Sequence, residues 1–251
     1  MKVATSVITA RRKSLARALE NRYLPLAEVC ARFGISPATA RRDFRALARE
    51  RKITRTYGGA LGKFDATFTS FADRRAVGQQ VKSRLAGEAL KLVPAHSTCF
   101  FDSGTTIYAL AEAIYRQPVP GLRAVTNSLP VAELLGRAQI EVYLLGGRFL
   151  QRQSTLLGPA ARQSARNWKF DRVFLGAMGF STRGIWASEA EVAAFQKAVI
   201  GRAHEVVVCA HAAKLDCESG IFLTPWKPKF RLVSDISPIQ RRRGKLPFSS
   251  V

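Results

Sequence analysis

Several features are scarce in this chain of 251 residues, and each scarcity argues against a class of protein. The four cysteines and three histidines show neither C-x-x-C nor any other metal-ligand spacing, so we expect no disulfide framework and no metal site. No apolar run approaches the length of a membrane span, and the first residues lack the apolar core of a signal peptide. A Walker loop and a G-x-G-x-x-G pattern after a strand are also missing. The sequence therefore predicts a cytoplasmic protein that needs no cofactor.

Acidic residues are scarce as well. Eighteen Asp and Glu residues stand against 40 Lys and Arg residues, which gives a formal net charge of +22. Residues 1–63 hold 15 basic and 4 acidic residues, half of the net charge in a quarter of the chain. This asymmetry indicates a polyanionic partner for the N-terminal region. Together with the length, it predicts a small domain at 1–60, a linker at 61–76, a larger domain at 77–240 and a basic tail at 241–251.

Residues 25–60 predict two short helices followed by a basic hairpin. Gly34 provides the turn between the helices. Ser36 before Pro37 is typical of a helix start, because the Ser oxygen accepts a free N–H and Pro at the first position loses no hydrogen bond. The helical period then separates an apolar face from an arginine face. The apolar face consists of Ala40, Phe44 and Leu47, and the opposite face of Ala38, Arg42, Arg45 and Arg49, with Thr39 and Arg41 on the flanks.

An arginine face backed by a small apolar stripe is typical of a recognition helix in the DNA major groove. We expect Thr39 and Arg42 to contact bases, and Arg41, Arg45 and Arg55 to contact phosphates. A solvated helical surface and an anionic membrane are the competing interpretations, and the order of turn, capped helix and hairpin favours double-stranded DNA. The full set of residues expected at the DNA is Ser36, Pro37, Ala38, Thr39, Arg41, Arg42, Arg45, Arg55 and Tyr57.

From Val77 onward, helical and strand patterns alternate. The expected strands are Thr98–Phe101, Arg123–Val125, Glu141–Leu145, Arg172–Leu175, Glu205–Cys209 and Phe230–Val233. The expected helices after a first one that begins near Val77 are Thr106–Tyr115, Leu129–Arg137, Pro159–Trp168 and Glu189–His204. This alternation predicts an α/β domain whose mostly parallel sheet is covered on both faces.

Small and polar residues follow the expected strands, and the carboxyl ends of parallel strands are where open sheets bind ligands. The segment DSGTT is the sharpest case, because a glycine and a helix N-terminus suit an anion and the carboxylate could accept hydroxyl hydrogens. The competing interpretation is that such residues only form tight turns and helix caps. The residues expected at this ligand site are Asp102, Ser103, Gly104, Thr105, Thr106, Thr126, Asn127 and Lys214.

Taken together, these segments resemble the DeoR family of bacterial transcriptional regulators. The segments ISPATARRDFRAL and ITRTYGGA resemble its winged helix-turn-helix, and FDSGTT, VTNS, LLGG and EAEVAAFQKAVIGRA recur in family order. The resemblance implies an α+β winged helix-turn-helix followed by a Rossmann-like α/β domain, similar to ribose-5-phosphate isomerase and coenzyme A transferase folds. It also implies an effector pocket for a phosphorylated sugar or related metabolite, lined by the residues given above. The segment His211–Lys214 departs from the family pattern, which leaves the effector open. Tyr57 stands where the family commonly has a histidine, and this change in the wing should leave DNA affinity intact.

We therefore expect a dimeric or tetrameric regulator, a repressor rather than an enzyme, that binds operator DNA at the nucleoid. Two alternatives stay open. One is a sugar-phosphate isomerase or transferase that uses Asp102, Lys214 and Asp216 as acid and base. The other is a non-specific nucleoid-type DNA binder with a vestigial pocket, which the basic tail favours.

Overall fold

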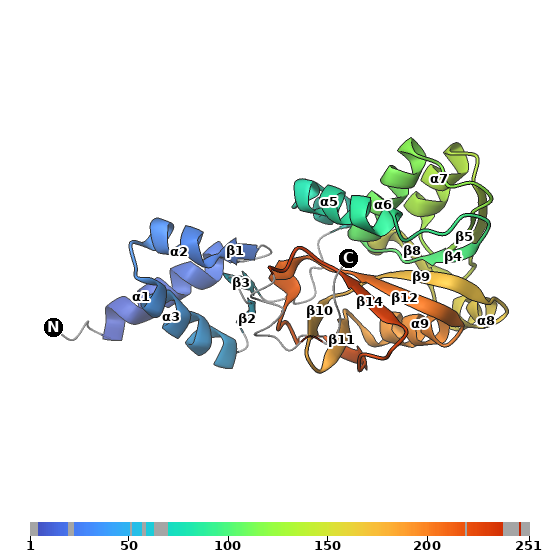
Figure 1. The fold of residues 1–251 in the computed structure, drawn as a ribbon. Coiled ribbons are helices and arrows are strands. Elements are labelled where there is room, and N and C mark those ends of the chain that lie inside the picture. The colour runs from blue at the N-terminus through green and yellow to red at the C-terminus, as the bar shows by residue number, and fades with distance from the viewer. Residues whose placement is uncertain are drawn as a thin grey trace. The chain divides into compact units, whose positions relative to one another are not determined.

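The computed structural model describes residues 5–19, 23–50, 52–56, 59–62, 70–218, 220–237 and 246 (Figure 1). The chain divides into two compact units. One consists of Met1–Thr69 with Ala213–Cys217, and the other of Ser70–Ala212 with Glu218–Val251. In the described part of the chain, no helix is long and apolar enough to cross a membrane.

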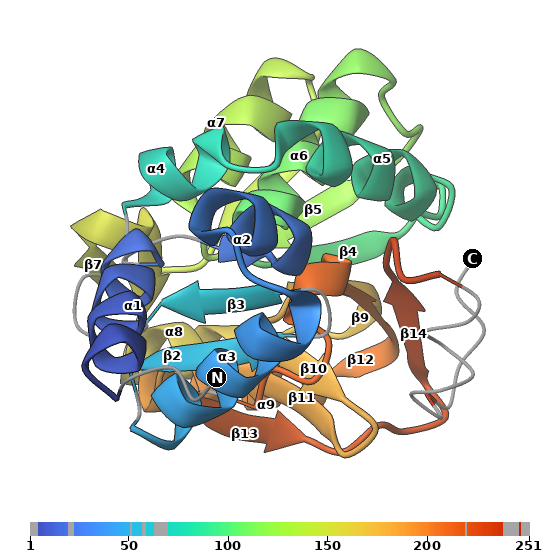
Figure 2. The ribbon, with the colours of Figure 1, turned by 90° about the vertical axis from the view of Figure 1, so that its left-hand side faces the viewer.

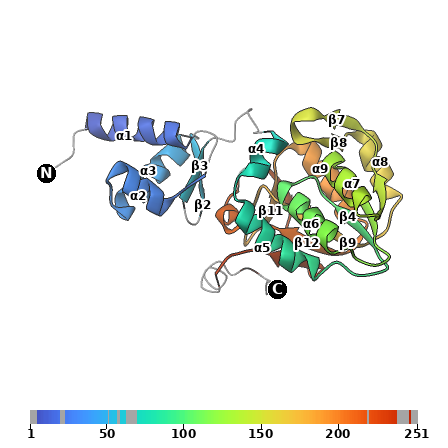
Figure 3. The ribbon, with the colours of Figure 1, turned by 90° about the horizontal axis from the view of Figure 1, so that it is seen from above.

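The N-terminal unit packs three helices beside a small antiparallel sheet (Figure 3). Its elements are α1 (Thr5–Ala18), β1 (Tyr23–Pro25), α2 (Leu26–Phe33), α3 (Pro37–Arg49), β2 (Ile53–Thr56) and β3 (Gly59–Gly62), with the strands in the order β1-β3-β2. Leu15 and Leu19 from the first helical segment are fully buried with Val29, Phe44 and Leu47. The expected two helices and hairpin are present, and α1 and β1 add a third helix and a third strand to them.

The larger unit is built around a six-stranded sheet. Its helices are α4 (Phe71–Ala76), α5 (Gln79–Leu90), α6 (Thr105–Arg116), α7 (Leu129–Arg137), α8 (Pro159–Arg166) and α9 (Ala190–Ile200). The strands of the main sheet are β4 (Thr98–Phe101), β5 (Arg123–Thr126), β6 (Glu141–Leu144), β9 (Phe170–Gly176), β12 (Ala203–Cys209) and β14 (Phe230–Val233).

All neighbouring strands of this sheet run parallel, in the order β14-β12-β9-β4-β5-β6. Helices α5, α6 and α7 cover one face, and α8 and α9 lie on the other (Figures 1 and 2). The central strands are buried on both faces, and the rings of Phe101 and Phe174 stack at 5.3 Å between neighbouring strands. The predicted α/β class with a mostly parallel sheet is thus confirmed.

Several elements differ from the sequence prediction. The span 61–76, expected to be a linker, ends in helix α4, which begins with a capping box between Ser70 and Asp73. The helix expected over Glu189–His204 ends at Ile200, because β12 begins at Ala203. Two small antiparallel sheets were not foreseen. They are formed by β7 (Arg148–Leu150) with β8 (Thr155–Leu157), and by β10 (Gly179–Ser181), β11 (Gly184–Ala187) and β13 (Ile221–Thr224).

The cysteines pack as core residues. Cys99 and Cys209 are buried in strands, and burial raises their thiol pKa values to about 11 and about 12. Both thiols are therefore protonated and unreactive near neutral pH. Arg241–Arg243 and Lys245 of the expected basic tail lie outside the described residues.

Candidate functional sites

The start of helix α3 is fixed by local hydrogen bonds. Ser36 is the N-cap, and its Oγ accepts the backbone N–H of Thr39 at 3.3 Å. Its Oγ also lies 3.0 Å from the Thr39 Oγ1. Pro37 takes the first helical position, and Gly34 adopts the left-handed conformation (φ +59°) that ends α2. Ser36 and Pro37, expected at the DNA, therefore also set the direction of α3.

Helix α3 presents the expected two faces. Ala40, Phe44 and Leu47 are buried, and Thr39 is half-buried at the flank. The exposed side chains are those of Ala38, Arg41, Arg42, Arg45 and Arg49. Arg55 lies in β2, paired with Ala60 of β3, and Tyr57 lies outside the described residues. The structure thus brings the four arginines of α3 together on one exposed face of that helix.

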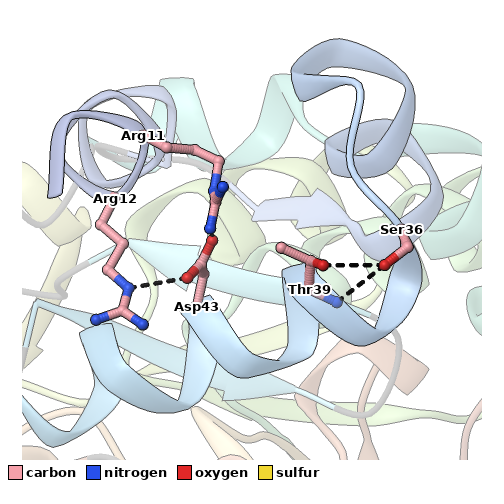
Figure 4. A network of polar contacts seen from close by, with 5 residues as sticks. All are labelled: Arg11, Arg12, Ser36, Thr39 and Asp43. Carbon is pink, nitrogen blue, oxygen red and sulfur yellow. Dashed lines mark hydrogen bonds and ion pairs between the residues drawn. The ribbon is translucent and has the colours of Figure 1, made fainter. Parts of the chain in front are cut away.

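One buried carboxylate on α3 was not anticipated. Asp43 is 1% exposed and accepts hydrogen bonds from Arg11 Nε at 2.7 Å and Arg12 Nε at 2.8 Å, both on α1 (Figure 4). Burial alone would raise the pKa of Asp43, but the hydrogen bonds and charges of the two arginines outweigh it and lower this pKa. An acidic residue on the core side of a basic helix is the signal in the sequence that could have revealed this contact.

In the larger unit, the carboxyl ends of two neighbouring strands, β4 and β9, meet at Asp102. Its backbone follows β4, and its Oδ1 accepts the N–H of Ser103 at 2.8 Å. The other oxygen, Oδ2, accepts the N–H of Gly176 at 3.1 Å and the Nε2 of Gln196 at 2.8 Å. Asp102 therefore joins the loop after β4 to the end of β9 and to helix α9. Gln196, a further residue of this site, was not foreseen from the sequence.

The Asp102 carboxylate is 4% exposed, and its electrostatics follow from that burial. Burial raises the pKa of Asp102, against the opposing effects of its hydrogen bonds from Ser103, Gln196 and Gly176 and of the Arg74 charge. Because its oxygens already accept three N–H groups, Asp102 serves first to hold the loops together. Its expected role as an acceptor for ligand hydroxyls stays a prediction.

Two further site residues also hold loops in place. Thr126 is fully buried; its Oγ1 donates to the carbonyl oxygen of Phe101 at 2.6 Å and accepts the N–H of Ser128 at 3.0 Å. The Nδ2 of Asn127 donates to Thr155 Oγ1 at 2.9 Å. In contrast, the buried Asn127 Oδ1 and Gln196 Oε1 accept no hydrogen bond from the residues that the structure describes. These two carbonyl oxygens are acceptors still available to a polar ligand.

Helix α6 begins beside these residues with Gly104 as its N-cap, so no side chain caps its first N–H groups. Thr105 and Thr106, in the first turn, are mostly buried, and Ser103 and Gly104 are half-buried. A Cβ atom placed on Gly104 would lie 3.6 Å from the Cα of Gly176, so the two loops are in van der Waals contact. An uncapped helix N-terminus is a favourable place for an anion.

A cation approaches the same site from helix α4. Phe71 packs edge-on against Tyr108 of α6 at 5.4 Å between ring centroids, and Arg75 Nη2 donates to Glu112 Oε1 of α6 at 2.7 Å. On the same helix, burial lowers the pKa of Arg74, and the negative charge of Asp102 opposes that shift. Arg74 is thus a positive charge that acts on Asp102, and it was not anticipated from the sequence.

Lys214 belongs to a different part of the structure. It ends the 3-10 helix η2 (Ala212–Lys214), and residues Ala213–Cys217 group with the N-terminal unit. Just before it, the backbone N–H of Ala212 donates to Asp235 Oδ1 at 2.7 Å. Asp235 thus supplies a carboxylate to a segment whose own sequence has none. The role of Lys214 at the ligand site stays a prediction.

The two units define a class of protein, a helix-turn-helix unit with a small antiparallel sheet followed by an α/β unit with a parallel sheet. Comparison with known families gives two matches. Residues 5–62 match the DeoR-like helix-turn-helix domain, and residues 78–236 match the DeoR C terminal sensor domain. The chain belongs to the DeoR family.

Curated relatives share this family. The glycerol-3-phosphate regulon repressor of Escherichia coli K12 is 33% identical over 163 residues, which is 64% of this chain and 64% of that protein. The chain thus matches less than two thirds of the length of that relative. The transcriptional repressor GlcR of Bacillus subtilis is 27% identical over 194 residues, 76% of this chain and 74% of that protein. Among solved structures, ribose 5-phosphate isomerase A of Neisseria gonorrhoeae is 20% identical over 55% of each chain, with a TM-score of 0.42.

Proposed function

We propose that the protein is a sequence-specific DNA-binding transcriptional regulator, a repressor, whose DNA binding responds to a phosphorylated sugar or related metabolite. The observation that carries this proposal is the exposed arginine face of α3 on a unit that matches the DeoR-like helix-turn-helix. The curated relatives named as repressors support the sign of regulation. We place the protein in the cytoplasm at the nucleoid, as a homo-oligomer.

At the DNA, the residues divide by role. Arg42 lies at the edge of the exposed face that borders Thr39, and it suits a bidentate contact with a guanine edge. Thr39 lies at the flank and suits a second base contact. Arg41 and Arg45, on the side of Arg42 away from Thr39, and Arg55 in β2 suit phosphates, which fix register without reading sequence.

At the effector site, the protein offers complementary groups. The uncapped N–H groups of α6 suit a phosphate, and Arg74 on α4 adds positive charge. The unpaired Asn127 Oδ1 and Gln196 Oε1 can accept hydrogen bonds from sugar hydroxyls. Helix α4 is the first helix of the larger unit after the helix-turn-helix in the chain. We infer that a ligand that draws Arg74 toward its phosphate biases α4, and thereby shifts the population of DNA-binding arrangements.

An enzymatic role is not favoured. The Asp102 carboxylate accepts three N–H groups, so it lacks the freedom of a general base. The other two groups considered for acid and base chemistry are Lys214 and Asp216. Both lie in the segment Ala213–Cys217, which groups with the N-terminal unit. We therefore assign no reaction to this site.

The experiment that tests DNA binding is a fluorescence anisotropy titration of the full chain. The DNA that lies upstream of its own gene is compared with a scrambled duplex of the same length and composition, at two salt concentrations. We expect binding to the upstream DNA to be at least 100-fold tighter at the higher salt, on the order of known specificity ratios. Equal binding to both duplexes would overturn sequence specificity and favour a nucleoid-type binder.

A further inference from the structure

Helix α1 carries an unusual charge pattern for a helix that packs in a small core. Its 14 residues include four basic side chains and no acidic one: Arg11, Arg12, Lys13 and Arg17. The described apolar residues that it buries are few, since Leu15 is its one fully buried large side chain. Besides Leu15 and the partly buried Ala16 and Ala18, polar contacts hold the helix on the unit.

Those polar contacts converge on a single acceptor. Both Arg11 and Arg12 reach Asp43 of α3 through Nε, the guanidinium nitrogen nearest the chain. Figure 4 shows the contact of Arg12 with Asp43 drawn from Nε, with no contact drawn from its two terminal nitrogens. The Arg12 side chain is 28% exposed and that of Arg11 is 18% exposed, whereas Asp43 is 1% exposed. Arg12 therefore keeps four N–H donors beyond the ion pair.

The charge balance of this cluster points to an anionic partner. One arginine would neutralise Asp43, and burying a carboxylate is costly unless it is paired. The second arginine leaves the group of the two arginines and Asp43 with a net charge of +1, held in place by hydrogen bonds. Glu50, another carboxylate that interacts with Arg12, is exposed and pairs with Lys52 at 2.7 Å. Asp43 is four residues from Thr39 and so lies on the same side of α3. The fixed charge thus borders the flank of α3 that carries a proposed base contact.

We propose that Arg12 of α1 is a phosphate contact of the DNA interface outside α3, and that Asp43 is a positioning residue that fixes its guanidinium. The interface then spans two helices: α3 in the groove and α1 against the backbone of the duplex. This inference rests on the proposed DNA-binding function. It adds a partner surface, α1, that the arginine face of α3 does not include.

The test uses the full chain on the upstream and the scrambled duplex, with the affinity measured by anisotropy at several salt concentrations. The variants are Arg12→Gln, Arg12→Lys, Asp43→Asn and the double variant Arg12→Gln/Asp43→Asn. The matched control is Arg137→Gln, which removes the same charge from an exposed ion pair with Glu133 on α7. Thermal unfolding of each variant checks that the helices remain folded.

For Arg12→Gln we expect the slope of log affinity against log salt to become shallower by about one, on both duplexes. Each neutralised phosphate contributes a salt exponent of about 0.9. The ratio of wild-type affinity to Arg12→Gln affinity should therefore be about eightfold larger at 0.1 M salt than at 1 M salt. Arg12→Lys should restore the slope, since it restores the charge. Arg137→Gln should leave the slope unchanged.

Asp43→Asn gives the most distinctive result. Removing a negative charge near DNA should raise affinity if charge alone matters, whereas loss of the positioning carboxylate should lower it. We expect lower affinity, and an effect in the double variant smaller than the product of the single effects. Higher affinity for a folded Asp43→Asn, or an unchanged slope for Arg12→Gln, overturns this inference. The proposed function still stands in that case, provided that the wild-type chain prefers the upstream duplex. If the wild type binds neither duplex, both proposals fail.

Discussion

Asp102 is the residue on which the loops of the larger unit most depend, and its replacement by Asn gives a quantitative prediction. Asn keeps the shape of the side chain but has one carbonyl oxygen in place of two acceptors. If this oxygen keeps the bonds from Gly176 and Gln196, the new NH₂ group faces the N–H of Ser103. One buried donor then loses its partner, which costs about 1–3 kcal/mol.

For a unit of this size, a loss of about 2 kcal/mol lowers Tm by about 4–8 °C. The assay is thermal unfolding of the full chain followed by circular dichroism. The control is Asp171→Asn, the same substitution at an exposed carboxylate that accepts one N–H, from Thr98, at 2.8 Å. We expect the control to lower Tm by less than half as much, because solvent can replace the lost acceptor.

The effect should also depend on pH. Burial raises the pKa of Asp102 above its ordinary value of 3.8, so the folded chain binds this proton more tightly than the unfolded chain. The stabilising contribution of this group is complete below the ordinary value and is lost as the pH rises through the raised pKa. The variant lacks this contribution. The difference in unfolding free energy between wild type and Asp102→Asn should therefore be larger at pH 4 than at pH 8. A penalty that grows with pH, or one no larger than that of Asp171→Asn, would refute the reasoning.

Three further predictions concern the two sites. Arg42→Ala should reduce discrimination at one operator position by about 1–3 kcal/mol in anisotropy titrations, and an equal loss on scrambled DNA would contradict a base contact. Phe44, whose side chain is 2% exposed, lies in the core of the N-terminal unit. Phe44→Ala should lower the free energy of unfolding of that unit by about 3–5 kcal/mol and abolish DNA binding, while the larger unit still unfolds cooperatively. Unchanged DNA affinity would be inconsistent with its place in the core. Arg74→Gln should raise the effector concentration that gives a half-maximal change in DNA affinity by about tenfold. This is the effect of losing a charged contact worth about 1.4 kcal/mol. An equal shift in Arg75→Gln would argue against a specific role for Arg74.

The features that the sequence predicts well are local ones. The cap at Ser36 and the two faces of α3 depend on neighbouring residues within a few helical turns, and the structure confirms them. The strands of the main sheet were also found, because their buried, apolar runs are bounded by small and polar loops. Helix α1 was missed since its large apolar residues are few and Asp43, the partner of its arginines, lies about 30 residues further along the chain.

The contacts that organise the effector site could not be predicted for a similar reason. Asp102 joins Gly176 and Gln196, which are 74 and 94 residues away in the chain, and nothing near any of the three indicates the others. Helix α4 has a recognisable capping pattern in Ser70 and Asp73, but its six residues are too few for a clear helical period. Arg74 was therefore placed in a linker by the sequence, whereas the structure places it on a helix that packs against α6.

The coupling of the two units is the central claim, and one measurement tests it directly. The affinity of the full chain for its upstream DNA is determined by anisotropy with and without a panel of sugar phosphates, each matched with its unphosphorylated sugar. We predict that at least one phosphorylated compound changes the affinity about tenfold or more, within the usual range of coupling free energies, and that its unphosphorylated partner does not. DNA binding that is sequence-specific but unchanged by every compound, or changed equally by the matched sugars, would contradict the account of the effector site.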